Sequence, residues 1–373
     1  MTAALQPRAW TAADAKNDTS WVLRLTAEEA EGFDAALKHA RQVGKPFVQM
    51  TQADFPLPTA SRIALERAIA CTQGRWGMCL VKGLPTERWT EDEARLAYWG
   101  MGMYMGTART QNRASQFMND VRDEGGTYKA TGGRGYNTNA SLDFHCDSCD
   151  VVGLLCRREA KLGGESKVVS SIALRDEIAR RRPDLVEVLQ GAWYHSYQGA
   201  QAPSEPPFYM CPILGNDPEH FAMRANRKNV MAAQRDFPEV PRLTPAQIEV
   251  LDLMDKVMAD PALCFSMWLE RGDMQLLNSY VTLHSRTDFQ DHDDPSLKRH
   301  LFRLWLAVPT SQPLPGQWQT YFGDVRAGSV RGGLVGSAMT QAFLDFEARQ
   351  AQTLGMTYTP RAVATDTQHA AAA

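Results

Sequence analysis

Three side chains in two distant segments are of the types that together bind one metal ion. His145 and Asp147 lie two residues apart in residues 137–156, and in a strand their side chains would point to the same face. His284 ends a second strand-like segment that begins at Asn278. Two histidines and one carboxylate leave half of an octahedron open, as in non-haem Fe(II) enzymes that bind a co-substrate and oxygen. The pattern predicts an iron site between two strands.

The His-x-Asp motif alone is weak, because the chain contains a second copy of it. His292 and Asp294 have the same spacing, but they lie in a run of charged residues that Pro295 ends. Such a run is typical of a solvated loop. We therefore expect His145 and Asp147, and not the second copy, to bind metal.

Two arginines follow on the next apolar segment. With strand periodicity, Arg299 and Arg303 share one face with Leu301 and Trp305. Arginines on the inner face of an apolar barrel are costly unless an anion pairs with them. A dicarboxylate co-substrate would supply that anion, since a guanidinium group binds a carboxylate through two charge-assisted hydrogen bonds.

These residues have an order and spacing that resemble those of a known family. Over roughly residues 137–309 the chain resembles the taurine dioxygenase-like (TauD/TfdA) family of Fe(II)/2-oxoglutarate-dependent dioxygenases. The resemblance rests on the following ordered set: His145-Cys-Asp147, Gly163-Gly-Glu-Ser166, Gly272-Asp273, Asn278, His284 and Arg299 through Arg303.

The resemblance implies a role for each matching residue. His145, Asp147 and His284 would be the iron ligands, and Arg299 would bind the distal carboxylate of 2-oxoglutarate, with Ser166 donating to the same group. Arg303 would brace the co-substrate or bind an anionic group of the substrate. The implied reaction uses O2, converts 2-oxoglutarate to succinate and carbon dioxide, and hydroxylates a small molecule, with desaturation or cyclisation as variants.

Two other functions are compatible with a three-ligand metal site. One is a metal-dependent jelly-roll oxygenase or isomerase that does not use 2-oxoglutarate, and the other is a non-catalytic binding protein with a structural ion. Neither accounts for Ser166, Arg299 and Arg303.

The candidate substrate contacts are mostly polar. Asn139, Ser141 and Asp143 would share the metal face of their strand, and Arg224 could reach the same pocket, although solvent is the default expectation for it. The glycine-rich residues 120–136 have no periodicity and could act as a lid. We expect a small polar metabolite with an anionic group, and the sequence does not identify it.

The pattern of elements predicts an α+β fold, a double-stranded β-helix (jelly roll) with helices packed outside it. We expect one domain over residues 1–373. It would comprise a mainly helical part (1–110), the jelly-roll core (137–309) and a C-terminal extension with a disordered tail (310–373).

Capping residues and apolar periodicity locate individual elements. Expected helices follow Thr26 (to Gly44), Thr90 and Thr244 (to Met258), and occupy residues 172–182 and 337–354. Expected strands lie in residues 151–155, 274–277, 280–284 and 301–309.

Composition limits the possible partners and compartments. The chain of 373 residues has a net charge of −3, 44% apolar residues and no apolar run long enough to cross a membrane, so nucleic acid and membrane partners are not expected. No signal peptide is recognisable, and seven scattered cysteines, including Cys146 and Cys149, are expected to be packed free thiols. We expect a cytoplasmic protein, and the sequence leaves a homo-oligomer open.

Overall fold

The structure, a computed structural model, describes residues 6–361. The predicted disordered tail from Thr365 onwards lies outside the described residues. None of the helices in residues 6–361 is both long and apolar enough to cross a bilayer.

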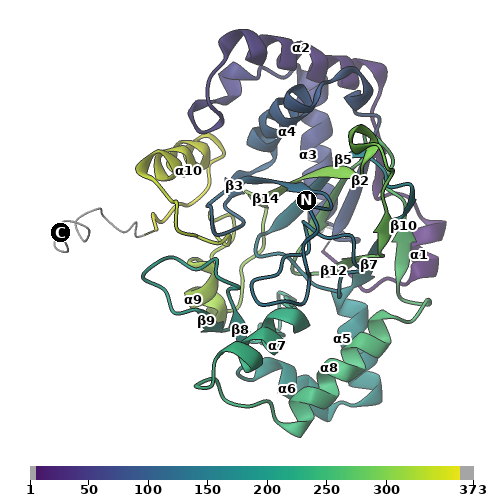
Figure 1. The fold of residues 1–373 in the computed structure, drawn as a ribbon, viewed down its shortest axis with the longest axis vertical. Coiled ribbons are helices and arrows are strands. Elements are labelled where there is room, and N and C mark those ends of the chain that lie inside the picture. The colour runs from purple at the N-terminus through teal and green to yellow at the C-terminus, as the bar shows by residue number, and fades with distance from the viewer. Residues whose placement is uncertain (1–5, 362–373) are drawn as a thin grey trace, which may run out of the picture.

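A seven-stranded sheet forms the larger layer of the core (Figure 1). All its neighbouring strands are antiparallel except β1 and β2, which are parallel. In spatial order the strands are β1 (Val22–Arg24), β2 (Met78–Lys82), β11 (Met274–Asn278), β5 (Val151–Arg158), β14 (His300–Ala307) and β3 (Thr107–Arg109), with β4 (Met118–Val121) also paired to β14.

A three-stranded antiparallel sheet forms the smaller layer. It consists of β10 (Phe265–Met267), β7 (Ser166–Ser170) and β12 (Thr282–Arg286). Apolar side chains of both layers, such as Trp305 and Val168, belong to one buried cluster, so the two sheets pack face to face. Two small pairs complete the strands: β6 (Leu162–Gly163) with β13 (Phe289–Gln290), and β8 (Tyr194–Ser196) with β9 (Phe208–Met210).

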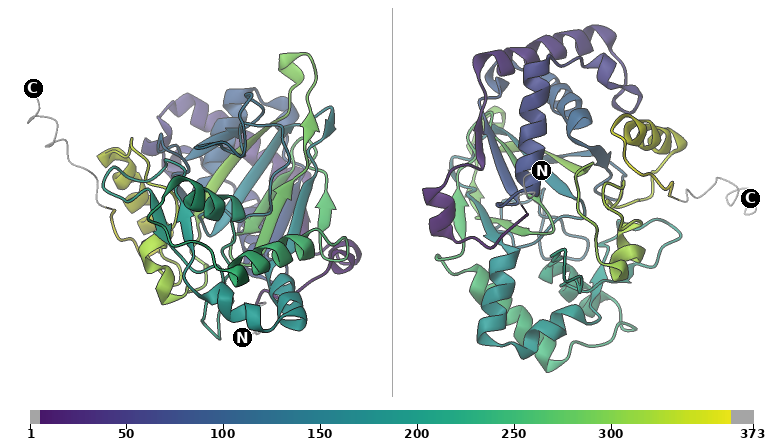
Figure 2. Two further views of the ribbon diagram at one scale, coloured as in Figure 1. Left: turned by 60° about the horizontal axis from the view of Figure 1, so that its bottom comes forward. Right: turned by 180° about the vertical axis from the view of Figure 1, so that it is seen from behind.

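Two N-terminal helices, α3 (Thr59–Gln73) and α4 (Glu91–Met105), cover the outer face of the larger sheet. The helix α2 (Ala27–Val43) packs on both of them, and α1 (Ala12–Asn17) lies beside β10 of the smaller sheet (Figure 1). Seen from behind, α3 runs across the sheet, where it packs on β2 and β11 (Figure 2, right). The predicted caps are confirmed: Thr26 and Thr90 each form a capping box, and Gly44 ends α2 with a left-handed φ of 65°.

A second group of helices lies at the opposite end of the molecule (Figure 1). It comprises α5 (Ser171–Arg181), α6 (Asp184–Gln190), α7 (Arg227–Asp236) and α8 (Pro245–Met258), and α8 begins after Thr244 as predicted. The C-terminal segment adds α9 (Gln319–Phe322) and α10 (Gln341–Thr353), so the last predicted helix begins four residues later than expected.

One predicted strand is wrong and another has different bounds. Residues 137–146 run beside β12 but meet it only at a hydrogen bond from Leu142 to Arg286 and at an isolated bridge between His145 and His284, so no continuous ladder forms. The predicted strand 280–284 begins instead at Thr282, because Ser279 and Tyr280 turn the chain between β11 and β12. The alternation of side chains predicted for residues 299–308 is confirmed by β14.

Candidate active site

The two candidate histidine ligands lie against each other at the edge of the smaller sheet. The main chains of His145 and His284 exchange two hydrogen bonds of 2.9 Å, and their ring centroids lie 4.3 Å apart. Nδ1 of His145 lies 2.9 Å from the carbonyl oxygen of Asp143, which can only accept, so this nitrogen carries the proton. Nε2 of His145 is thereby left with a free lone pair, as a metal ligand requires.

The carboxylate of Asp147 lies close to the ring of His284. Its Oδ2 atom lies 3.9 Å from Nε2 of His284, and its Oδ1 atom lies 3.5 Å from Nη1 of Arg303. Oδ2 is buried and has no hydrogen-bond partner among residues 6–361. A buried carboxylate oxygen without a donor is costly unless a cation fills its place.

Local electrostatics keep these groups in the protonation states that a metal needs. Burial, together with the neighbouring His145, lowers the pKa of His284 to about 3, so its imidazole is neutral. Burial opposes ionisation of Asp147, but the charge of Arg303 is the main opposing influence, and the pKa of Asp147 lies below its ordinary value. Two imidazole ligands and one ionised carboxylate fit Fe(II) and leave positions for other ligands.

Arg299 brings a buried positive charge into the same cavity. Its side chain is 6% exposed, and its guanidinium group lies over the ring of Phe289 at 5.0 Å from the centroid. Within the described residues none of its side-chain N–H groups has an acceptor, and Nη1 is fully buried. Burial accordingly lowers the pKa of Arg299 to about 10. The group therefore fits a site for a bound anion.

Two residues of the neighbouring turn and strand support this anion site. Ser166, the first residue of β7, lines the cavity, and its hydroxyl donates to the side-chain oxygen of Gln275 at 3.1 Å. At Gly164 a Cβ atom would lie 3.0 Å from Nε of Arg299, and the φ of +78° also favours glycine. The glycine thus leaves room for the arginine to lie flat beside the turn.

Arg303 lies between the metal ligands and the cavity wall. Besides its contact with Asp147, it donates from Nε to the side chain of Gln111 at 2.8 Å. Its guanidinium lies 5.0 Å from the ring centroid of Trp305 and 5.6 Å from that of Tyr136. Arg303 therefore holds the Asp147 carboxylate in place, and its remaining N–H groups face the cavity.

The three candidate ligands line one open cavity together with Ser166, Arg299 and Arg303, and its volume is about 1150 Å³ with the open solvent at its mouth included. The predicted alternation along β14 is found. Leu301, Arg303 and Trp305 face this cavity, as does Arg299 just before the strand, and the alternate residues of β14 face the helices. Residues 120–136, the expected lid, contribute Tyr128, Arg134 and Tyr136 to the cavity wall. Sequence reasoning missed other polar and aromatic parts of the wall, which are Tyr197, Tyr209, Asn226, Lys228, Asn229, Arg286 and Tyr321. Arg286 alone had a sequence signal, because it lies two residues after His284 on the same strand.

The structure places the predicted substrate residues away from the cavity lining. Asn139 and Ser141 are exposed, and Asp143 lies 3.3 Å from Nζ of Lys129. The strand alternation that was expected to turn them toward the metal does not exist, since the segment is irregular. Their predicted shared face with His145 is therefore wrong.

Arg224 is buried, so the default expectation that it lies in solvent is wrong. It is also not among the residues that line the cavity. It is 2% exposed and lies beside the rings of Tyr209 and Tyr321, which stack on each other with their centroids 4.0 Å apart; its guanidinium is 5.1 and 4.3 Å from these centroids. It donates to both tyrosine hydroxyls, at 3.0 Å in the case of Tyr321. Arg224 thus positions two aromatic rings that do line the cavity.

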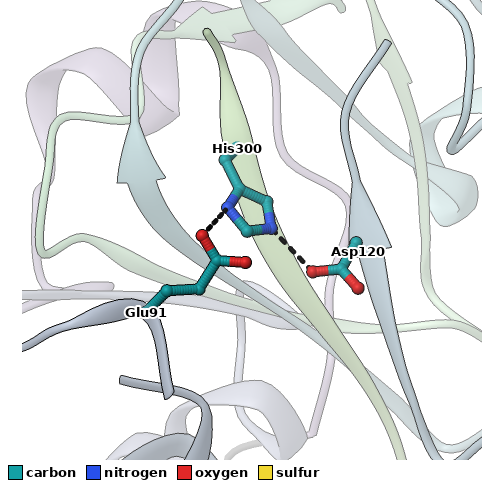
Figure 3. A group of neighbouring side chains, drawn as sticks. All are labelled: Glu91, Asp120 and His300. Atoms are coloured by element: carbon teal, nitrogen blue, oxygen red, sulfur yellow. Dashed lines mark hydrogen bonds and ion pairs between the residues drawn. The ribbon is translucent and has the colours of Figure 1, made fainter. Parts of the chain in front are cut away.

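A second group of metal-binding residue types lies behind β14. His300 is fully buried, with Nε2 2.7 Å from Asp120 and Nδ1 3.6 Å from Glu91 (Figure 3). Each carboxylate already has an arginine partner: Arg95 donates to Asp120 at 2.7 Å, and Arg157 donates to Glu91 at 2.9 Å. This group is an ion-pair network that fixes the start of β14, next to Arg299.

Comparison with known proteins adds family and fold relationships. The model of the family "Taurine catabolism dioxygenase TauD, TfdA family" matches residues 39–305. "FR-33289 synthase" of Streptomyces rubellomurinus (strain ATCC 31215) is 30% identical over 327 residues, which cover 85% of this chain and 94% of the relative. "Taurine hydroxylase-like protein SAT17" of Stachybotrys chartarum is 24% identical over 79% of this chain and 77% of its own.

Solved structures share the fold at low sequence identity. Asparagine oxygenase (AsnO) is 18% identical with a TM-score of 0.58, over 80% of this chain and 99% of its own. The non-heme iron oxygenase OrfP, in complex with Fe and alpha-ketoglutaric acid, is 15% identical with a TM-score of 0.57, over 77% of this chain and 94% of its own. The predicted α+β jelly roll is thereby confirmed. The chain belongs to the TauD/TfdA family and is an Fe(II)- and 2-oxoglutarate-dependent dioxygenase.

Proposed function

We propose that His145, Asp147 and His284 bind the iron of this dioxygenase, and that Arg299 and Ser166 bind the distal carboxylate of 2-oxoglutarate. The observation that carries the proposal is a pair of buried, oppositely charged groups in one cavity. The Oδ2 atom of Asp147 and the guanidinium of Arg299 both lack a hydrogen-bond partner within the described part of the chain. A metal ion beside the first and a carboxylate beside the second would satisfy both.

Iron bound together with 2-oxoglutarate supplies the oxidising power for attack on an unactivated C–H bond, with O2 consumed and succinate and carbon dioxide released. The side chains of the protein would hold the metal, orient its ligands and exclude water. His145 and His284 would offer nitrogen lone pairs to the metal, and Arg303 orients the Asp147 carboxylate. Apolar and aromatic walls such as Leu301 and Trp305 keep water away from the substrate.

The use of 2-oxoglutarate explains more of the cavity than a metal alone would. A jelly-roll oxygenase or isomerase without the co-substrate, or a binding protein with a structural ion, gives Arg299 no anion. Such a protein would keep a buried cation without function, at a cost in stability.

We further propose that the substrate is a small polar molecule with an anionic group and that the product is hydroxylated. The cationic residues of the cavity support this proposal. Asparagine oxygenase, of similar fold, has been solved in complex with 2S,3S-3-hydroxyasparagine, and OrfP in complex with (3S)-hydroxy-L-Arg, and both molecules are small, polar and hydroxylated. Their identity does not transfer to this chain, which shares only 17% or less of its sequence with them.

A cytoplasmic location without nucleic acid or membrane partners completes the proposal. All seven cysteines, which lie within the described residues, are free thiols. This suits a reducing compartment. The net charge of −3 gives no general attraction to polyanions.

The test uses the second His-x-Asp copy as an internal control. Protein is titrated under argon with Fe(II) and 2-oxoglutarate, and the weak visible charge-transfer band of the iron chelate is recorded. His145→Ala, Asp147→Ala and His284→Ala should lose the band and the substrate-dependent release of succinate. His292→Ala and Asp294→Ala should keep both, since these residues lie in a surface loop.

Circular dichroism of each variant separates loss of the site from loss of the fold. If folded His284→Ala retained the band and near-normal turnover, the assignment of the third ligand would be wrong. A wild-type protein that bound Fe(II) without any effect of 2-oxoglutarate would instead contradict the role of Arg299 and Ser166.

A further inference from the structure

The cavity is lined by far more positive than negative charge. Five cationic side chains line it, and Asp147 is the single carboxylate among the described lining residues. The cations come from four separate segments of the chain and are Arg134, Lys228, Arg286, and the pair Arg299 and Arg303.

Most of these cations have no anionic partner. Of the five, Arg303 alone has a carboxylate within 4 Å anywhere in residues 6–361. Arg134 donates to a main-chain carbonyl at 3.0 Å, and Lys228 and Arg286 also donate only to main-chain carbonyl oxygens. A carbonyl oxygen satisfies a hydrogen bond but does not neutralise a charge.

Binding of the expected iron and 2-oxoglutarate would not remove the excess of positive charge in the cavity. The two charges of Fe(II) and the one of Arg299 are balanced by Asp147 and the two carboxylates of 2-oxoglutarate. Arg134, Lys228, Arg286 and Arg303 then remain without compensation. Like charges in a half-buried cavity repel each other and lose hydration, so a further anion would be bound strongly there.

Two of these cations, Lys228 and Arg134, belong to neighbouring parts of the cavity wall. Lys228, in the first turn of α7, reaches the carbonyl of Gly133, which is adjacent to Arg134. The Lys228 ammonium also lies over the ring of Tyr128, 4.8 Å from its centroid. Burial, with Arg134 nearby, lowers the pKa of Lys228 to about 8. The N-terminus of α7 adds a positive partial charge at the same place, where Asn229 also lines the cavity.

We propose that the substrate carries an oxyanion with two negative charges, of the phosphate or dicarboxylate type, and that Lys228 and Arg134 bind it. The proposal rests on the function proposed above and specifies its substrate class. One ion pair would leave most of the excess charge uncompensated, whereas a doubly charged group can accept from both cations at once. Arg134 belongs to the glycine-rich segment 122–136, so binding of the anion would also hold this segment over the cavity.

The test compares anions that differ in charge and not in shape. Protein loaded with Fe(II) and saturating 2-oxoglutarate under argon is titrated calorimetrically with sulfate and with methanesulfonate, which carry two charges and one. Phosphate serves as a second compact dianion, and glutarate serves as a dicarboxylate. Sulfate should bind about tenfold or more tightly than methanesulfonate. Whichever of phosphate and glutarate binds with the higher affinity identifies the type of oxyanion.

Matched variants assign the preference to residues. Lys228→Met and Arg134→Gln should each reduce the preference for the dianion, whereas Lys129→Met, which changes an exposed lysine of the same segment, should keep it. The iron chelate band should form in all three variants, since none of these residues belongs to the metal or 2-oxoglutarate site.

Each outcome has a distinct meaning. Equal affinity for sulfate and methanesulfonate in the wild type would overturn the requirement for two charges. An unchanged preference in folded Lys228→Met and Arg134→Gln would overturn their assignment. Absence of the chelate band in the wild type would refute the proposed function itself, whatever the anions do.

Discussion

Replacement of Arg299 by glutamine should weaken 2-oxoglutarate binding without weakening the folded protein. The guanidinium group is buried and has no hydrogen-bond acceptor within the described residues, so the unliganded protein gains nothing from its charge. Arg299→Gln keeps most of the volume and removes the charge. The two measured quantities, affinity and stability, should therefore change in different directions.

The size of each effect follows from the structure. A charge-assisted contact to a buried carboxylate is worth about 2 to 5 kcal/mol, so the dissociation constant of 2-oxoglutarate should rise about 30-fold to several thousand-fold. Burial lowers the pKa of Arg299 from 12.5 to about 10. At about 1.4 kcal/mol per pKa unit, the buried cation costs the folded state on the order of 3 kcal/mol at any pH well below 10.

The sign of the stability effect follows from this pKa. A lowered pKa of a basic group means that the folded state disfavours the proton. The penalty is therefore fully present at neutral pH, begins to fall as the pH reaches the folded pKa, and is gone only above the unfolded pKa of 12.5. At pH 7, unliganded Arg299→Gln should therefore unfold at the same or a higher temperature than the wild type. Saturating 2-oxoglutarate should stabilise the wild type much more than the variant.

The assay combines an anaerobic titration of the iron chelate band with differential scanning calorimetry, with and without 2-oxoglutarate. Lys298→Gln is the control, because it removes an exposed cation from the adjacent position. Equal 2-oxoglutarate affinity in Arg299→Gln and the wild type would refute the assignment. A large loss of stability in the unliganded variant would show that the charge has a structural partner.

Two further predictions concern the network behind the cavity and the C-terminal helix. Burial opposes ionisation of Asp120, but hydrogen bonds from His300 and Arg95 hold the pKa of Asp120 below its ordinary value, so its stabilising effect is complete at neutral pH and is lost as the pH falls below about 4. Urea unfolding should therefore show a stability difference between wild type and Asp120→Asn that shrinks from pH 7 to pH 3, and a constant difference would contradict this. Glu347→Ala should cost about 3 to 5 kcal/mol in the same assay, because it leaves the buried Arg109 without its ion-pair partner. A similar loss in Asp345→Ala, an exposed change on the same helix, would mean that the helix and not the ion pair is responsible.

Local periodicity predicted the parts of this molecule that repeat regularly. Helix caps such as Thr26 and Thr244 predicted where helices begin, because capping depends on a few adjacent residues. The alternation along β14 predicted which side of the strand faces the cavity, since that strand is paired on both sides throughout its length. In both cases the determining interactions lie within a few residues or repeat along the element.

The same rules failed where the chain leaves regular structure. Residues 137–146 have a strand-like pattern but make only isolated bridges, so alternation did not apply to Ser141 or Asp143. Lys228 and Tyr321 reach the cavity from helices far along the chain, and no spacing rule relates them to His145. Arg286 could have been found, because strand alternation places it on the side of His284.

The C-terminal segment gives the cavity a wall that lies outside the family match. The match ends at residue 305, yet Tyr321 and Leu334 line the cavity. The segment is anchored beside the metal ligands, because Arg331 donates to Asp150 at 2.7 Å. One part of the cavity wall is therefore encoded downstream of the stretch that carries the proposed iron ligands. Recombination between relatives beyond residue 305 would exchange this part of the wall while the proposed iron ligands and Lys228 are inherited intact, which makes this junction a natural crossover point for enzyme engineering.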